Sequence, residues 1–281
     1  MPRFPAMTHG DAPREPVPSP LAADRARTGG CLCAAVRFAT EGPLREVVFC
    51  HCTQCSRTSG HYWAATSVPL DRFRLTDARG LRWFRSSETA ERGFCGGCGA
   101  SLLWKPAGEA AIHIAPGAFD MPSGLVAGPH IFSADAGDYY APEGPPPPFS
   151  GIAPGQLSCR CLCGGAAFTV AGPAGHIAAC HCGQCRRLSG HYAASFDADE
   201  SSLVWAARAT LGEFRTPGGG LRGFCKVCGG SLWFRAADGA FSVEAGAVEG
   251  ATGGRLTEHI FASDKGDWYA LTDGLPQRPG A

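Results

Sequence analysis

A repeated cysteine pattern constrains this chain more than any other feature of its sequence. Seven cysteines recur at a constant offset of 130 residues, namely Cys31/Cys161, Cys33/Cys163, Cys50/Cys180, Cys52/Cys182, Cys55/Cys185, Cys95/Cys225 and Cys98/Cys228. Neighbouring residues recur as well, as in the segments 59–62 and 189–192, which both read Ser-Gly-His-Tyr. A fixed period of this length indicates an internal duplication, so the sequence predicts two similar domains.

The duplication sets the predicted domain limits. We predict domains at 25–140 and 156–275, a Pro/Gly-rich linker at 141–155, a disordered proline-rich arm at 1–24 and a tail at 276–281. Short alternating segments at 35–39, 101–104 and 111–114 are separated by Gly, Pro and Asp, which is typical of strands and turns. Each domain is therefore expected to be mainly β with little helix, and one short helix is expected after Cys52 or Cys182.

The charge and composition of the chain limit the kinds of partner that it can bind and the cellular compartment in which it is expected. The 25 Lys and Arg balance 25 Asp and Glu, so no net field favours nucleic acid or an anionic membrane. No apolar run approaches the roughly 20 residues of a membrane span, and residues 1–24 lack the pattern of a signal peptide. A cytoplasmic protein is expected. In a reducing compartment its 15 cysteines would bind metal and would not form disulfides.

Two cysteine motifs of each copy suit one four-coordinate zinc site. A CxxC knuckle supplies two thiolates from one turn, and Gly99 and Gly229, which follow the knuckles, adopt positive φ without strain. The CxC pairs are expected to supply the other two from one face of a strand, because strand side chains alternate with a period of two. The predicted ligands are Cys31, Cys33, Cys95 and Cys98, and Cys161, Cys163, Cys225 and Cys228.

The remaining paired cysteines form a trio in each copy, Cys50, Cys52 and Cys55, and Cys180, Cys182 and Cys185. Three thiolates without an obvious fourth predict a zinc with an open position, where a substrate thiol is held as a nucleophilic thiolate. In the alternative interpretation, His51, His181 or a more distant side chain closes the site and makes it structural. We favour a supporting role for both histidines, because a residue between two ligands reaches the same ion poorly. Two Zn²⁺ per domain and four per chain are expected.

With these motifs the sequence resembles the glutathione-dependent formaldehyde-activating enzyme (CENP-V/GFA) family, which carries CxC, CHCxxCR and FCxxCG segments. They stand here at 31–33, 50–55 and 94–99 and again in the second copy, followed by a closing segment from His259 to Pro276. The resemblance implies an Mss4-like, mainly β fold with one structural and one catalytic zinc per domain. It also implies that Cys50, Cys52, Cys55, Cys180, Cys182 and Cys185 are catalytic. Ser56 departs from the family arginine, although Arg57 follows it.

The resemblance further implies a carbon–sulfur lyase that interconverts glutathione and formaldehyde with S-hydroxymethylglutathione. Arg57, Arg186 and Arg187 are the candidates to pair with a carboxylate of such a small thiol substrate. The alternative is a non-catalytic module in which zinc braces a surface for protein or nucleic acid. A third hypothesis, thiol–disulfide exchange, requires metal-free cysteines. The sequence leaves the oligomeric state open.

Overall fold

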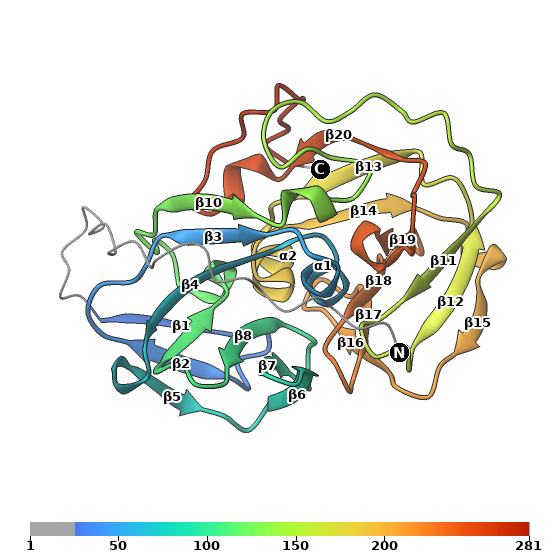
Figure 1. Ribbon diagram of the computed structural model, residues 1–281. Coiled ribbons are helices and arrows are strands. Elements are labelled where there is room, and N and C mark those ends of the chain that lie inside the picture. Colours follow the sequence, from blue (N-terminus) through green and yellow to red (C-terminus); the bar gives the residue numbers. More distant parts are fainter. Residues whose placement is uncertain (1–25, 281) are drawn as a thin grey trace.

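The structure is a computed structural model that describes residues 26–280, so the arm predicted at 1–24 lies outside the described residues. The chain is mainly β and contains two similar sets of sheets, as the duplication predicts (Figure 1). Within 26–280, no strand of the first copy pairs with a strand of the second.

Each copy combines a three-stranded sheet with a seven-stranded sheet. The small sheets have the orders β1 (Arg27–Gly30), β2 (Arg37–Thr40), β5 (Phe73–Asp77), and β11 (Gln156–Arg160), β12 (Ala167–Ala171), β15 (Val204–Ala207). The large sheet of the first copy has the order β10 (Ala127–Ile131), β3 (Val47–Cys50), β4 (Trp63–Pro69), β9 (Ala111–Ile114), β8 (Ser101–Pro106), β7 (Ala90–Cys95), β6 (Leu81–Ser87). The large sheet of the second copy has the order β20 (Arg255–Ile260), β13 (His176–Cys180), β14 (Ala193–Asp197), β19 (Phe241–Glu244), β18 (Ser231–Arg235), β17 (Leu221–Cys225), β16 (Leu211–Arg215).

The strands follow from alternating burial. In β12, Phe168 and Val170 are buried in the core, whereas Ala167 and Thr169 between them are only partly covered. Such alternation places one face of a strand in the core and the other toward solvent. The segments 101–104 and 111–114 are strands as predicted, and the segment 35–39 contributes to a strand that begins at Arg37.

Two short helices lie side by side between the copies (Figure 1). They are α1 (Thr53–Ser59) and α2 (Gly183–Ser189), which confirms the helix expected after Cys52 and Cys182. Each ends at a glycine with positive φ, Gly60 or Gly190, a conformation that glycine adopts without strain. The other helical segments are 3-10 turns, Leu70–Arg72, Pro116–Ala118, Ser133–Asp135, Glu200–Ser202, Ala245–Ala247 and Ala262–Asp264.

The copies join through pairs of equivalent contacts. The Gly246 amide donates to the Gly60 carbonyl at 2.8 Å, and the Gly117 amide donates to the Gly190 carbonyl at 2.7 Å. A Cβ at Gly117 would lie 2.2 Å from the Arg186 carbonyl oxygen, so only glycine permits this approach. Each helix end is therefore held by the backbone of the other copy.

A second pair of contacts crosses between the copies farther along the chain. Asp138 accepts hydrogen bonds from the Thr252 amide at 3.0 Å and from the Thr252 hydroxyl at 2.8 Å. Asp267, its equivalent in the second copy, accepts from the Ser123 hydroxyl at 2.5 Å and from the Gly124 amide at 2.8 Å. Each copy thus binds a turn of the other through a carboxylate.

The predicted linker and tail both contact the second copy. Arg255 Nε donates to the Pro147 carbonyl at 2.8 Å, and the Phe149 ring packs edge-on against His176. At the tail, the His259 amide donates to Pro276 O at 2.9 Å and the Arg278 amide donates to His259 O at 2.8 Å. Residues 276–278 therefore run along the outer edge of β20. None of the described helices combines the length and the apolar run that a bilayer crossing needs.

Candidate metal centres and the residues around them

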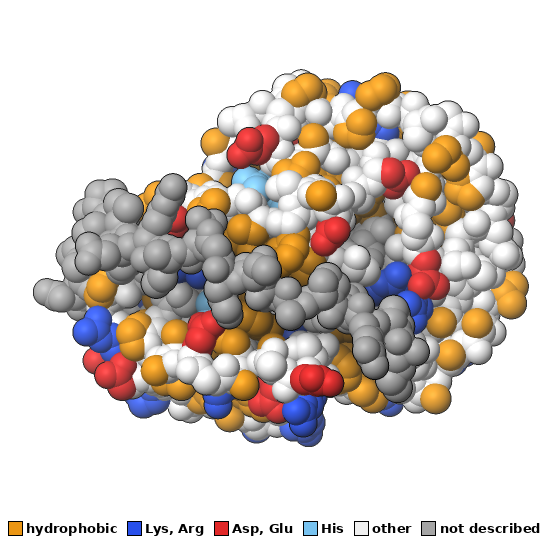
Figure 2. Space-filling view, in the orientation of Figure 1, with side chains coloured by type: hydrophobic (Ala, Val, Ile, Leu, Met, Phe, Trp, Pro, Cys, Tyr) orange, Lys and Arg blue, Asp and Glu red, His pale blue; other side chains and the backbone are white. Residues whose placement is uncertain are grey.

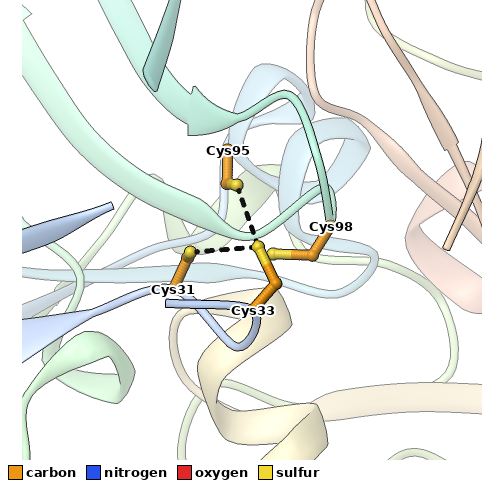
Figure 3. Close-up of side chains that lie close together, drawn as sticks. All are labelled: Cys31, Cys33, Cys95 and Cys98. Atoms are coloured by element: carbon orange, nitrogen blue, oxygen red, sulfur yellow. Dashed lines mark hydrogen bonds between the residues drawn. The ribbon is translucent and has the colours of Figure 1, made fainter. Parts of the chain in front are cut away.

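The first kind of cysteine cluster gathers four sulfurs from two distant segments. Cys31 Sγ and Cys33 Sγ lie 3.5 Å apart, and Cys33 Sγ and Cys95 Sγ lie 3.6 Å apart, with Cys98 beside them (Figure 3). The second copy repeats the arrangement with Cys161, Cys163, Cys225 and Cys228. Within each cluster all four sulfurs lie within 4.8 Å of one another. In the first copy the cluster brings the turn after β1 against the end of β7, and in the second copy it brings the turn after β11 against the end of β17.

The backbone that carries the CxC pairs is a turn, whereas the prediction placed them on a strand. Cys31 and Cys33 lie in a turn after β1, so the expectation that one face of a strand presents them is wrong. The Val36 amide donates to Cys31 Sγ at 3.3 Å, and Ala34 has a positive φ of 61°. The turn therefore supplies a second knuckle, which converges two sulfurs as a CxxC turn does. Gly99 and Gly229, with φ of 78° and 76°, adopt the positive φ expected after the other knuckle.

The second kind of cluster is built where a strand meets a helix. Cys50 ends β3, Cys52 caps α1 and Cys55 lies in its first turns, with Cys50 Sγ and Cys52 Sγ 3.6 Å apart. Cys180, Cys182 and Cys185 repeat this on β13 and α2. In each trio the third cysteine is buried and the first two are partly exposed. No histidine or carboxylate of the described residues joins either trio.

The spacing of the sulfurs fits thiolates around one ion. All described cysteines are free thiols. Two sulfurs that are each about 2.3 Å from a tetrahedral zinc lie about 3.8 Å apart. The observed sulfur–sulfur separations of 3.5–3.6 Å are close to that value and far from the roughly 2.05 Å of a disulfide. The clusters are therefore able to hold four metal ions per chain, two in each copy.

A buried arginine touches the third sulfur of each trio, and the sequence analysis missed it. Arg92 Nη2 donates to Cys55 Sγ at 3.4 Å, and Arg222 Nη2 donates to Cys185 Sγ at 3.1 Å. Burial lowers the pKa of each guanidinium, but the neighbouring cysteines, together with Glu244 beside Arg222, outweigh burial and raise the pKa of both arginines. The sequence did contain a sign of their importance, because both arginines belong to an Arg-Gly-Phe-Cys segment that occurs in each copy. A fixed positive charge therefore faces each trio from inside the protein.

His51 and His181 are buried and bonded away from the trios. His51 Nδ1 lies 2.7 Å from the Tyr140 hydroxyl, and its Nε2 lies 2.8 Å from His130 Nδ1. Burial, followed by the charge of His130, lowers the pKa of His51 to about 4, so its ring is neutral at pH 7. Both ring nitrogens thus have partners outside the cluster, which agrees with a supporting role.

The three arginines proposed as substrate contacts lie between the copies. Arg57 Nη2 lies 3.2 Å from Glu249 Oε1, and Arg187 Nη2 lies 2.8 Å from Asp120 Oδ1. Arg186 Nη1 donates to the carbonyl of Gly117 at 2.8 Å. The hydrogen bond from Arg37, followed by those from Thr28 and Arg187, holds the pKa of Asp120 well below its usual range. Their substrate contacts stay predictions, and the contacts in the structure join one copy to the other.

The remaining unusual cysteine stands apart from all four clusters. Cys159 lies on β11, is 1% exposed and belongs to none of the groups that could hold a metal among the described residues. Burial raises the pKa of its thiol to about 12, so it stays protonated at pH 7. Cys159 is therefore a natural control for thiol removal.

The copies differ beside the helix ends. Glu244 of the second copy is 2% exposed, and its Oε1 lies 3.5 Å from Arg222 Nη1, whereas Ala115 holds the equivalent position in the first. Trp63 of the first copy is buried near Gly190 and corresponds to Ala193 in the second. The second copy thus has a buried carboxyl that the first lacks.

We predict that Glu244 makes stability fall as pH rises. Burial raises the pKa of Glu244 from 4.5 to about 7, so the folded chain holds this proton more tightly than the unfolded chain. Its neutral form favours folding, and the advantage is lost between about pH 4.5 and 7. From pH 6 to pH 8 the loss is about 1 kcal/mol. Urea unfolding of Glu244→Gln should show the variant gaining that amount over the parent chain across this range. An unchanged difference would contradict the prediction.

A cavity of about 450 Å³ opens between the copies. Equivalent residues of both copies line it, including Tyr62 and Tyr192, His130 and His259, and Tyr140 and Tyr269. The Tyr62 hydroxyl donates to the Tyr192 hydroxyl at 3.0 Å, which joins two lining residues from different copies. The partners of His51 and His181 therefore line a space shared by both copies.

Comparison with known proteins gave one match to a family. The family described as glutathione-dependent formaldehyde-activating enzyme matches residues 26–135 and 156–264, one match for each copy. These two ranges cover more than half of the chain. A search of the curated proteins found no match.

Proposed function

Because the chain belongs to the glutathione-dependent formaldehyde-activating enzyme family, we propose that it is a zinc-dependent carbon–sulfur lyase acting on the adduct of a small thiol with an aldehyde. Glutathione and formaldehyde are the proposed pair, interconverted with S-hydroxymethylglutathione. The observation that carries the proposal is the presence, in each copy, of one four-cysteine cluster and one three-cysteine cluster. Four thiolates saturate a tetrahedral zinc, whereas three leave one position for a ligand from solution.

The four-cysteine clusters suit a structural role. Each joins a turn after the first strand to a knuckle 62 residues later, as the Cys33–Cys95 and Cys163–Cys225 contacts show. A metal bound there would close a long loop and stabilise the fold. The zinc they would hold has no open position.

The three-cysteine clusters suit the proposed reaction of a thiol with an aldehyde. A zinc ion bound to such a trio would lower the pKa of an incoming thiol and hold its sulfur. In the synthetic direction the thiol sulfur adds to the carbonyl carbon of formaldehyde, one carbon–sulfur bond forms, and the thiol proton ends on the former carbonyl oxygen. Arg92 and Arg222 donate to Cys55 and Cys185, and their charge offsets part of the negative charge of a trio that has accepted a further sulfur.

Metal analysis combined with zinc X-ray absorption tests the proposal. We expect about four zinc ions per purified chain, one for each cluster. Addition of glutathione should raise the mean number of sulfur ligands per zinc from about three and a half to about four, because only the trios have a free position. Formaldehyde consumption in the presence of glutathione gives the activity. An unchanged sulfur count together with no consumption would refute the proposal.

The alternative of a zinc-braced module for nucleic acid gains no support from surface charge. Basic and acidic side chains are interspersed over the described residues visible in Figure 2, and the whole chain has no net charge. A protein that binds phosphate backbones usually concentrates Lys and Arg on one face. The lyase therefore remains our proposal.

A further inference from the structure

The two large sheets end in equivalent edge strands, of which one is paired with a further segment and the other is open. These strands are β20 and β10, and both lead into the same tripeptide, His-Ile-Phe, at 259–261 and 130–132. The backbone has the same conformation at the end of each tripeptide, where Phe132 has a φ of 55° and Phe261 a φ of 54°. A strand edge with unpaired amides and carbonyls is a template for a further strand. The two copies therefore show one kind of edge in an occupied and in an open form.

The occupied edge, on β20, shows which bonds an added segment makes. The tail runs parallel to β20 from Pro276 to Gly280. The His259 amide donates to the Pro276 carbonyl at 2.9 Å, the Arg278 amide donates to the His259 carbonyl at 2.8 Å, and the Phe261 amide donates to the Gly280 carbonyl at 2.9 Å. Only the third residue of the segment has to supply an N–H group. Proline, which has none, is therefore compatible with the first and fourth positions.

The equivalent backbone groups of β10 are unpaired. The Ile131 carbonyl accepts from the His51 amide at 3.1 Å, so Ile131, like Ile260 in β20, directs its backbone groups toward its own sheet. Successive residues of a strand direct their backbone groups to opposite sides, so the amide and carbonyl of His130 point outward. Within residues 26–280, no hydrogen bond engages these two groups or the Phe132 amide. The edge of β10 therefore offers the donors and the acceptor that the tail uses on β20.

Apolar side chains are also exposed along the open edge. Ile131 is 38% exposed and Phe132 is 47% exposed. Their equivalents beside the tail, Ile260 and Phe261, are partly buried. A segment added to β10 would therefore cover apolar surface in addition to pairing the backbone.

The chain of the first copy does not cover its own edge. When the two tripeptides are aligned, Pro147 of the linker takes the place of Pro276. Its carbonyl accepts from Arg255 Nε of the second copy at 2.8 Å, and Phe149 packs edge-on against His176 of the second copy. The linker thus binds the second copy and leaves β10 open.

One side-chain contact of the tail has no counterpart at β10. Arg278 Nε lies 2.5 Å from Glu258 Oε2 on β20, whereas Pro129 stands at the equivalent position of β10. An arginine at the third position of a segment added to β10 would gain no ion pair there. The edge of β10 therefore favours an apolar or neutral side chain at that position.

We propose that the outer edge of β10 binds an extended peptide segment of a partner protein, which adds to the sheet as a parallel strand. The segment has an N–H group and an apolar or neutral side chain at its third position, and it tolerates proline at its first and fourth. Backbone hydrogen bonds to His130 and Phe132 supply affinity, and the exposed side chains of Ile131 and Phe132 supply apolar contacts. The surface lies outside the metal clusters, so this binding does not depend on the proposed lyase reaction.

NMR of the full chain with a synthetic peptide tests the proposal. The peptide has the sequence of residues 274–281 with Arg278→Leu, which removes the ion pair that favours β20. We expect saturable binding with a Kd below about 1 mM. At saturation, exchange of the His130 and Phe132 amide protons with solvent should slow at least about tenfold, because both become hydrogen-bonded. The His259 amide should be unchanged, because the tail already occupies that edge.

Methylation of single peptide amides tests the backbone pairing. A methyl group on the amide of the third residue removes the donor to the His130 carbonyl and should raise Kd at least about tenfold. The matched control carries the methyl group on the second residue, whose equivalent in the tail, Gln277, donates no backbone hydrogen bond to β20. This peptide should bind with a Kd changed less than about threefold.

Four results would overturn the proposal. They are the absence of saturable binding, equal effects of the two methyl positions, changes at the His259 amide in place of His130, and a His130 amide that is already protected before any peptide is added. In the last case the edge is occupied by another part of the chain or by a second copy. Dependence of the protection on protein concentration would then identify the second copy.

Discussion

Replacing Cys52 and Cys182 together by alanine is expected to lower glutathione-dependent formaldehyde consumption more than about 100-fold while the chain stays folded. Even the outer partners of a metal ligand cost about 10- to 100-fold, so loss of a ligand at both trios should cost more. The fold should persist because each trio spans only a strand end and the first turns of a helix. The helices keep their contacts with the other copy through Gly60–Gly246 and Gly190–Gly117. Steady-state kinetics and circular dichroism measure the two effects.

Cys159→Ala supplies the control for this pair of substitutions. It removes a buried thiol that belongs to neither kind of cluster, so activity and zinc content should be unchanged within about twofold. Full activity in the double variant, or loss of secondary structure equal to that of a four-cysteine variant, would remove the distinction between the two kinds of site.

The second large effect concerns the four-cysteine clusters. Cys225→Ser is expected to unfold the second copy at 25 °C. Structural zinc contributes about 10–16 kcal/mol in small zinc-dependent folds, and a whole domain is stable by only about 5–15 kcal/mol. Loss of even half of the free energy that the metal contributes would therefore exceed the free energy of unfolding of many domains. Thermal unfolding followed by circular dichroism, together with zinc analysis, should show about two zinc ions fewer, because the unfolded copy loses both of its sites, and the loss of roughly half of the cooperative transition.

The matched variant is Cys185→Ser, which changes a buried cysteine of the same copy in the other kind of cluster. Its melting temperature should fall by no more than a few degrees, as expected for a change of about 1 kcal/mol. Equal destabilisation by Cys225→Ser and Cys185→Ser would show that both metals brace the fold. It would then favour the structural interpretation of the trios.

The cysteine pattern predicted the fold class and the grouping of the thiols. Cysteines that bind one metal ion recur in short motifs with fixed spacing, and these motifs are visible in the sequence. The duplication, the mainly β architecture and the short helix after Cys52 all follow from periodicity and motif spacing. The presentation of Cys31 and Cys33 was predicted wrongly, since alternation alone does not distinguish a strand from a turn with positive φ at Ala34. Local geometry of this kind depends on which backbone groups bond to the sulfur.

Contacts between distant segments could not be predicted from one sequence. Arg57, Arg186 and Arg187 looked like free cations beside a site, but their partners lie in the other copy, between 67 and 192 residues away. Asp273 reads as an ordinary loop residue until the fold brings it 2.8 Å from His259. Arg92 and Arg222 were visible only as part of a repeated segment, because no general rule pairs an arginine with a third cysteine.

Fusion of the two copies into one chain has a consequence for how they diverge. In an assembly of two separate identical subunits, every substitution appears on both sides of the symmetry axis. Here the reciprocal clasp made by Asp138 and Asp267 keeps a symmetric junction, yet Glu244 lies beside Gly60 of the other half, where the equivalent contact with Gly190 is made by Ala115. When both halves are encoded in one gene, one half can retain a structural role while substitutions change the chemistry of the other. The identical subunits of a homodimer cannot diverge in this way.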